Sequence, residues 1–239
     1  MRYLTLCCDY DGTLARHGSL SSDTIESLER VIASGRRTLL VTGRELGDLK
    51  QVCPRLDLFE YVIAENGALL YRPTTREERL LAAPPPARFA AALRERGISP
   101  LSVGRVIVAT REPHESAVLE VVRELGLELQ VIFNKGAVMV LPPGVNKATG
   151  LASALAAMGA SAHNTVGVGD AENDHALLAA CECAVAVANA LPALKEAADI
   201  VTAAENGAGV SELIEALLRD DLAGYGSRLT RPERPAQQR

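Results

Sequence analysis

Short apolar segments alternate with helix-like segments along most of this chain, and this alternation limits the folds open to it. Apolar runs of strand length occur at residues 2–8, in RTLLVTGR and in YVIAENG. Between the first two, SSDTIESLERVIASG places apolar residues at helical spacing, with Asp23 and Glu26 in the positions of a capping box. Strands separated by helices build parallel sheets with helices on both faces. Residues 1–65 are therefore predicted to fold as βαβαβ.

The alternation is interrupted near residue 72, where RPTTREERLLAAPPP is charged and then rich in proline. The segment that follows predicts a compact α+β block, which ends at Pro142-Pro143-Gly144. Its expected elements are a helix at 86–96, a strand at 103–109, a helix at 113–125, and strands at 127–133 and 136–141. Strand and helix patterns then alternate again as far as NGAGVSELIEALLRD.

The predicted fold class is therefore α/β, a doubly wound parallel sheet with a small α+β domain inserted into it. The sheet domain takes residues 1–76 and 142–221, and the inserted domain takes residues 77–141. Residues 222–239 are rich in arginine and proline and are predicted to be disordered.

Composition and charge argue against several classes of function. The formal net charge is -5 and no basic stripe is interleaved with aromatic residues, so nucleic acid is not an expected partner. No apolar run is long enough to span a membrane, and we expect no signal peptide before the first strand. The five cysteines fit no zinc spacing and favour buried thiols in a reducing cytoplasm. The oligomeric state stays open.

Two acidic residues follow the first apolar run, in LTLCCDYDGTLA. Side chains alternate along a strand, so Asp9 and Asp11 are expected to start on the same side of the chain. Two carboxylates roughly 4–5 Å apart repel each other by a few kcal/mol at an effective dielectric constant near 20. A cation or a bound proton offsets such repulsion, and the alternative is a solvated Asp-x-Asp turn. Open α/β sheets bind ligands where their strands end, which favours a site.

Polar residues also follow two other predicted strands. Thr42-Gly43-Arg44 supplies a hydroxyl, a backbone N–H and a guanidinium suited to phosphate oxygens, although an ST-turn explains the same residues. GVGDAEND places Asp170 after a strand and Asn173 and Asp174 in the next helical turn, where acids are also common caps. Lys147, one of 4 lysines, stands where a helix begins and could serve phosphate as a point charge or simply be solvated. Carboxylates together with a substrate phosphate are the ligands that Mg²⁺ prefers.

Taken in order, DYDGTLA, VTGR, the NK pair at residues 146–147 and GVGDAEND resemble the four motifs of the haloacid dehalogenase superfamily of aspartate-nucleophile phosphotransferases. The insert between the second and third motifs is similar to that of the Cof-like group, as are ENGA at residues 65–68 and the closing NGAGV. The resemblance covers residues 3 to about 218. It implies a Rossmann-like core, a cap that closes over the substrate, and a cytoplasmic, Mg²⁺-dependent phosphatase.

The resemblance implies a role for each motif residue. Asp9 would be the nucleophile that forms an aspartyl-phosphate, and Asp11 would be the general acid and then the base for water. Mg²⁺ would be held by the Asp9 carboxylate, the Asp11 main-chain carbonyl and Asp170, with Asp174 supporting it. The transferred phosphoryl group would contact Thr42, Lys147, Asn173 and an N–H group near Gly43.

The cap is expected to contact the leaving group, and it is small for this group of proteins. A small phosphate monoester is therefore the expected substrate, either a sugar phosphate or a phosphoglycolate-like acid. Arg44 and Asn66 are expected leaving-group contacts. Asn134 and Lys135 are further candidates, although they could simply form the turn between two cap strands.

Three alternatives remain open at this point. A phosphomutase uses the same scaffold, and Arg105 and Arg111 are the cap arginines that could hold a second phosphate. A phospho-accepting receiver domain also places acids, Thr and Lys on a doubly wound sheet, but it lacks the DxDGT signature and the inserted cap. A catalytically silent binding module would keep the fold without the activity.

Overall fold

Two β-sheets organise the chain in the computed structural model, which describes residues 1–225. The larger sheet has eight strands in the order β12-β11-β10-β1-β2-β3-β4-β5. Its strands are β1 (Thr5–Asp9), β2 (Arg37–Val41), β3 (Tyr61–Ala64), β4 (Leu69–Arg72), β5 (Glu77–Leu80), β10 (Thr165–Gly169), β11 (Cys183–Ala186) and β12 (Ile200–Val201).

The strand β1 lies inside the larger sheet and pairs in parallel with β2 on one side and β10 on the other. Every residue of β1 is buried, as expected for a strand covered on both faces. The parallel pairing continues through β3, β11 and β12, whereas β4 and β5 are antiparallel. The predicted α/β class with a doubly wound sheet is confirmed, with an antiparallel edge that the sequence patterns do not predict.

Helices cover both faces of the larger sheet. On one face, α1 (Ser22–Ala33), α2 (Leu46–Val52), α7 (Pro192–Ala197) and α8 (Asn206–Asp220) bury apolar side chains against Leu6 and Cys8 of β1. On the other face, α5 (Lys147–Met158) and α6 (His175–Ala180) pack against Cys7 of the same strand. Both cores are mainly aliphatic, and they hold β1 rigidly between the two layers of helices.

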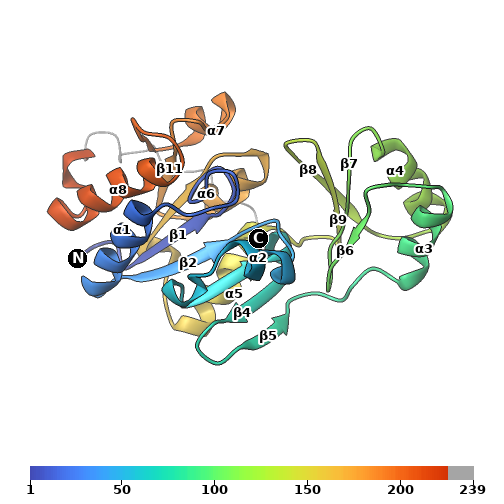
Figure 1. The fold of residues 1–239 in the computed structure, drawn as a ribbon, viewed down its shortest axis with the longest axis horizontal. Helices are drawn as coiled ribbons and strands as arrows, with labels where there is room; N and C mark the ends of the chain where they lie inside the picture. Colours follow the sequence, from blue (N-terminus) through green and yellow to red (C-terminus); the bar gives the residue numbers. More distant parts are fainter. Residues whose placement is uncertain (226–239) are drawn as a thin grey trace.

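The smaller sheet is antiparallel, in the order β6-β7-β9-β8. Its elements are β6 (Ser102–Val103), β7 (Val108–Arg111), β8 (Gln130–Asn134), β9 (Ala137–Leu141), α3 (Ala87–Glu95) and α4 (Glu115–Glu124). The helices pack on one face around Phe89 and Val118. The other face contributes Ile132 and Met139 to an apolar cluster that includes Ala68 of the larger unit. Figure 1 shows the smaller unit beside the larger one, joined to it by two chain segments.

The hairpin of β4 and β5 differs from the prediction that placed residues 77–80 in the inserted domain. β5 pairs with β4 at the edge of the larger sheet, and all four of its residues are exposed. An exposed edge strand carries charged side chains on both faces, so it has no apolar alternation that a sequence pattern could detect. We therefore propose that the inserted domain begins after Leu80 and not at residue 77.

Two further predictions about single helices and strands are corrected. Ser21 and not Asp23 caps α1, because the Ser21 side chain accepts the N–H group of Thr24. The strand predicted at 103–109 is two short strands, β6 and β7, joined by a turn.

Leu222, where the tail was predicted to begin, is buried in the core beside α8, and a short helical turn follows it at Ala223–Tyr225. The remainder of that tail, residues 226–239, lies outside the described residues. Among the described residues, no helix combines the length and the apolar character needed to cross a bilayer.

Candidate active site

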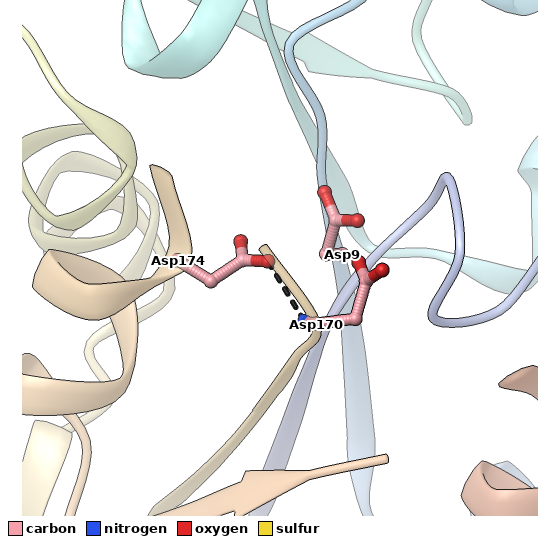
Figure 2. Close-up of side chains that lie close together, drawn as sticks. All are labelled: Asp9, Asp170 and Asp174. Carbon is pink, nitrogen blue, oxygen red and sulfur yellow. Dashed lines mark hydrogen bonds between the residues drawn. The ribbon is translucent and has the colours of Figure 1, made fainter. Parts of the chain in front are cut away.

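Three buried carboxylates meet at the C-terminal edge of the larger sheet. Asp9 is the last residue of β1, Asp170 follows β10, and Asp174 lies in the next helical turn, Glu172–Asp174. One oxygen from each carboxylate lies within 4.8 Å of the others. Figure 2 shows the Asp9 and Asp170 carboxylates close together and Asp174 turned toward the backbone of Asp170. Neighbouring parallel strands end at the same edge, which brings these residues together from distant parts of the chain.

Lys147 compensates two of these carboxylates. It is the first residue of α5, only 1% exposed, and its Nζ lies 2.5 Å from Asp9 Oδ1 and 2.6 Å from Asp174 Oδ1. Burial raises the pKa of Asp9 well above its usual range, and the ammonium opposes that rise. Burial also lowers the pKa of Lys147, but the Asp174 and Asp9 carboxylates outweigh burial and the net shift is upward. Lys147 therefore holds its positive charge between the two acids.

Asp170 has a different set of partners, and one of them comes from the smaller unit. Its Oδ1 accepts the Thr13 hydroxyl at 3.1 Å, and its Oδ2 accepts the Lys135 ammonium. Lys135 lies in the turn between β8 and β9 with a φ of 48°. Burial raises the pKa of Asp170, and Lys135 opposes the rise. The tip of the hairpin formed by β8 and β9 thus reaches the acids of the larger unit.

Gly12 and Asp174 shape the space around Asp170. Gly12 has a φ of 86°, and a Cβ there would lie 2.7 Å from Lys135 Nζ. Asp174 Oδ2 accepts the backbone N–H groups of Asp170 at 2.9 Å and Ala171 at 3.0 Å. Asp174 therefore fixes the loop that follows β10 while its second oxygen binds Lys147.

Asp11 does not join the group of three acids, and its carboxylate has a partner of its own. β1 ends at Asp9 and the chain turns at Gly12, so strand alternation does not extend to residue 11. The Asp11 carboxylate accepts Arg44 Nε at 2.6 Å and Nη2 at 2.9 Å, and its side chain is 41% exposed. Arg44 also pairs with Asp48, so its guanidinium is held by two acids beside the site.

The remaining predicted residues lie on the loops after β2, β3 and β10. The ST-turn is present, because Thr42 Oγ1 accepts the Arg44 N–H at 3.1 Å. Asn173 Nδ2 donates to Asn66 Oδ1 at 3.0 Å, which leaves Asn66 Nδ2 and Asn173 Oδ1 buried without a partner in the described part of the chain. A Cβ on Gly43 would lie 3.7 Å from Asn173 Nδ2, so these loops adjoin. Buried unpaired amide groups of this kind are typical of a site that binds a polar ligand.

Two residues near the site were missed by the sequence patterns. Asn189 follows β11, donates to the Gly12 carbonyl at 2.7 Å and accepts the Asn206 N–H at 2.8 Å. Glu65 follows β3 and is buried with its carboxylate turned toward the smaller unit. Glu65 stands directly after β3, so the strand-end argument used for Asp9 and Asp170 could have selected it, whereas Asn189 lies three residues beyond the end of β11.

Comparisons with known proteins agree with this geometry. The family described as haloacid dehalogenase-like hydrolase matches residues 6–87 and 106–214. A phosphoglycolate phosphatase from Methanothermobacter thermautotrophicus is 31% identical over 218 residues, which cover 87% of this chain and 96% of that protein. Another, from Halorubrum lacusprofundi, is 32% identical over 209 residues and covers 83% of this chain and 90% of that protein.

A solved structure shares the fold. A haloacid dehalogenase-like hydrolase from Bacteroides thetaiotaomicron aligns with a TM-score of 0.77 at 21% identity, covering 90% of this chain and 99% of that one. At that identity, the similarity supports the arrangement of both units, including the inserted one, and carries no information about the substrate.

Proposed function

Because this chain belongs to the haloacid dehalogenase-like hydrolases, in their Cof-like group of phosphatases, we propose that it hydrolyses a small phosphate monoester whose leaving group carries a carboxylate. The main observation in support of this reaction is the group of Asp9, Asp170 and Asp174, with Lys147 buried among them. Phosphoglycolate is the type of substrate that we propose, supported by the similar phosphoglycolate phosphatases.

Two aspartates would carry the chemistry. An Asp9 oxygen attacks the phosphorus and forms the aspartyl-phosphate, while the bond from phosphorus to the leaving oxygen breaks and Asp11 gives its proton to that oxygen. Asp11 then takes a proton from water, which attacks the phosphorus and releases phosphate with Asp9 restored. Asp11 is partly exposed, whereas Asp9 is buried beside Lys147, and Asp11 would carry the proton after it releases the Arg44 guanidinium that it binds in this structure.

The acids fit a magnesium ion. Three buried carboxylates within 4.8 Å of one another offer the hard oxygen ligands that Mg²⁺ prefers, and two lysines balance their charge in this structure. We propose that Asp9, Asp170 and the Asp11 carbonyl hold the ion and that Asp174 supports it. Bound there, Mg²⁺ would neutralise charge on the phosphoryl oxygens.

The phosphoryl group would be bound by Lys147 and by the loops after β2 and β10. We assign the contacts to Thr42, Gly43, Lys147 and Asn173. Asn66 would offer its unpaired amide to the leaving group, and Arg44 would lie beside it. The apolar contact between the two units and the reach of Lys135 support the assignment of the inserted domain as a cap.

Lys135 supports the choice of an acidic leaving group. It brings a positive charge from the cap to the acids of the larger unit, and its side chain is still 47% exposed. An ammonium at the edge of the site would attract a carboxylate on the leaving group. We further propose a reducing cytoplasmic setting, supported by five cysteines whose side chains are all buried.

Phosphate release from a panel of esters tests this function. The panel holds phosphoglycolate, a neutral analogue without the carboxylate and several sugar phosphates, each with Mg²⁺ or with EDTA. We expect Mg²⁺-dependent release that is fastest for phosphoglycolate and absent in Asp9→Asn. In Lys135→Met, the advantage of phosphoglycolate over its neutral analogue should shrink about twofold to fivefold, the effect of losing roughly 0.5–1 kcal/mol of charge interaction at a half-exposed ammonium.

Two results would contradict the assignment. Equal rates with phosphoglycolate and its neutral analogue in the wild-type protein would reject the acidic leaving group. Phosphate transferred to a second position of a sugar phosphate, without release, would identify a phosphomutase.

A further inference from the structure

A buried carboxylate of the larger unit binds the backbone of the inserted unit. Glu65 follows β3 and is 1% exposed. Its Oε1 accepts the N–H group of Arg105 at 2.9 Å, and its Oε2 accepts those of Val106 at 2.7 Å and Ile107 at 2.9 Å. These three donors form the turn between β6 and β7. Hydrogen bonds to a carboxylate are stronger than bonds between neutral groups, so this one side chain is a strong contact between the two units.

Both sides of the contact are shaped for it. Glu65 has a φ of 52°, in the left-handed region that residues other than glycine rarely adopt. On the other side, a Cβ at Gly104 would lie 2.8 Å from Glu65 Oε1, closer than any real Cβ approaches. The turn therefore needs a glycine at residue 104 so that the backbone can close around the carboxylate.

The segment that holds the cap also holds the loop after β2. The backbone N–H of Glu65 donates to the Arg44 carbonyl at 2.9 Å, and that of Asn66 donates to the Thr42 carbonyl at 2.9 Å. The Arg44 side chain in turn binds Asp11. A continuous chain of hydrogen bonds thus runs from the cap turn through Glu65 to the loop that binds the proton-transferring aspartate.

We propose that Glu65 is a positioning residue that fastens the cap over the active site through the turn at residues 104–107. It holds the cap in register with the loop that carries Thr42 and Arg44. Its effect on turnover rests on the proposed function, whereas its effect on the cap does not. Among the described residues no lysine or arginine side chain pairs with Glu65, so the three N–H groups are the donors that compensate its charge.

Amide hydrogen exchange in the full-length protein tests the contact directly. In Glu65→Gln the side chain keeps its shape but has one acceptor oxygen, and its NH₂ group faces backbone donors. We expect exchange at Arg105, Val106 and Ile107 to become about tenfold to hundredfold faster, the range that follows from losing a hydrogen bond to a charged group. Glu60→Gln, which removes a carboxylate that pairs with Arg37 inside the larger unit, should leave exchange at the turn unchanged.

A second pair of variants tests the link to turnover and covers the case in which one variant folds poorly. Gly104→Ala should lower kcat/KM about tenfold in the wild-type background, because its methyl group displaces the carboxylate. In a Glu65→Ala background the carboxylate is absent, so Gly104→Ala should have little further effect on kcat/KM. In both single variants the loss should fall mainly on KM, because a cap that is held less firmly binds the substrate less tightly.

The outcomes separate this proposal from the proposed function. Unchanged exchange at residues 105–107 in Glu65→Gln, or additive effects of Glu65→Ala and Gly104→Ala, would overturn the role of Glu65. A wild-type protein that releases no phosphate from any ester would reject the proposed function, while the exchange comparison would still decide whether Glu65 fastens the cap.

Discussion

Replacing Lys147 with methionine is expected to destabilise the protein strongly and in a pH-dependent way. The Lys147 ammonium is buried between Asp9 and Asp174, at 2.5 Å and 2.6 Å. Methionine keeps much of the side-chain volume but leaves two carboxylates without their cation. Removing one partner of a buried ion pair lowers the free energy of unfolding by about 3–5 kcal/mol. At about 2–4 °C per kcal/mol for a chain of this size, the melting temperature should fall by roughly 6–20 °C at neutral pH.

The pH dependence follows from the direction of the Asp9 shift. Burial already raises the pKa of Asp9, and the variant lacks the ammonium that opposes the rise. A carboxyl with a raised pKa in the folded state favours folding below its unfolded pKa, near 4, and that contribution is lost as the pH rises through the folded pKa. The fall in melting temperature caused by Lys147→Met should therefore be small at pH 4.5 and large at pH 7.5.

Thermal melts of the metal-free protein from pH 4.5 to 7.5 provide the measurement. Lys50→Met is the matched control, because the Lys50 side chain is 40% exposed and pairs with Glu78 at the surface. Its loss should cost less than about 1 kcal/mol. A Lys147→Met deficit no larger than that of Lys50→Met at pH 7.5, or one that stays constant with pH, would refute the reasoning.

Three further changes have expected outcomes. Asp170→Asn should abolish the rise in melting temperature that Mg²⁺ gives the wild-type protein in scanning fluorimetry, a rise worth about 2.7 kcal/mol at a hundredfold excess over Kd; an equal rise in both would contradict the proposed metal site. Ser21→Ala should cost about 1 kcal/mol in urea denaturation because it removes the cap of α1, whereas a similar loss in the exposed neighbour Ser22→Ala would argue against capping. Gly67→Ala should cost several kcal/mol, since φ is 107° and the new Cβ would lie 2.5 Å from the Asn146 carbonyl carbon; Gly47→Ala, a helix position with open space, should instead gain about 0.5–1 kcal/mol.

The larger sheet was predictable because its central strands are buried on both faces. Such strands read as unbroken apolar runs, and the polar residue after each run marks the edge where ligands bind. Asp9 and Asp170 could be selected in this way, and the loop after β3 by the same reasoning. The edge strand β5 could not be predicted in this way. All four of its residues are exposed, and the first three are charged, so they form no apolar pattern. Its place depends on pairing with β4.

Contacts between the two units could not be read from the sequence either. The Asp11 carboxylate turns to Arg44 because β1 stops at Asp9, and strand alternation does not show where a strand stops. Glu65 binds backbone N–H groups about forty positions away. Because every residue except proline has such a group, the sequence does not show which ones bind Glu65. Lys135 was predicted only as a leaving-group contact or a turn residue, since its contact with Asp170 depends on how the two units pack.

The insertion of the smaller unit between β5 and α5 also sets the order in which a ribosome can complete this fold. β1 emerges first, but its parallel neighbour β10 follows only after the whole smaller unit has been synthesised. At about 5–20 residues per second, β1 waits on the order of ten seconds or more with the backbone groups of one edge unpaired. During that time Asp170 and Asp174 have not yet been made. The acidic centre can therefore assemble only after the whole smaller unit has been synthesised.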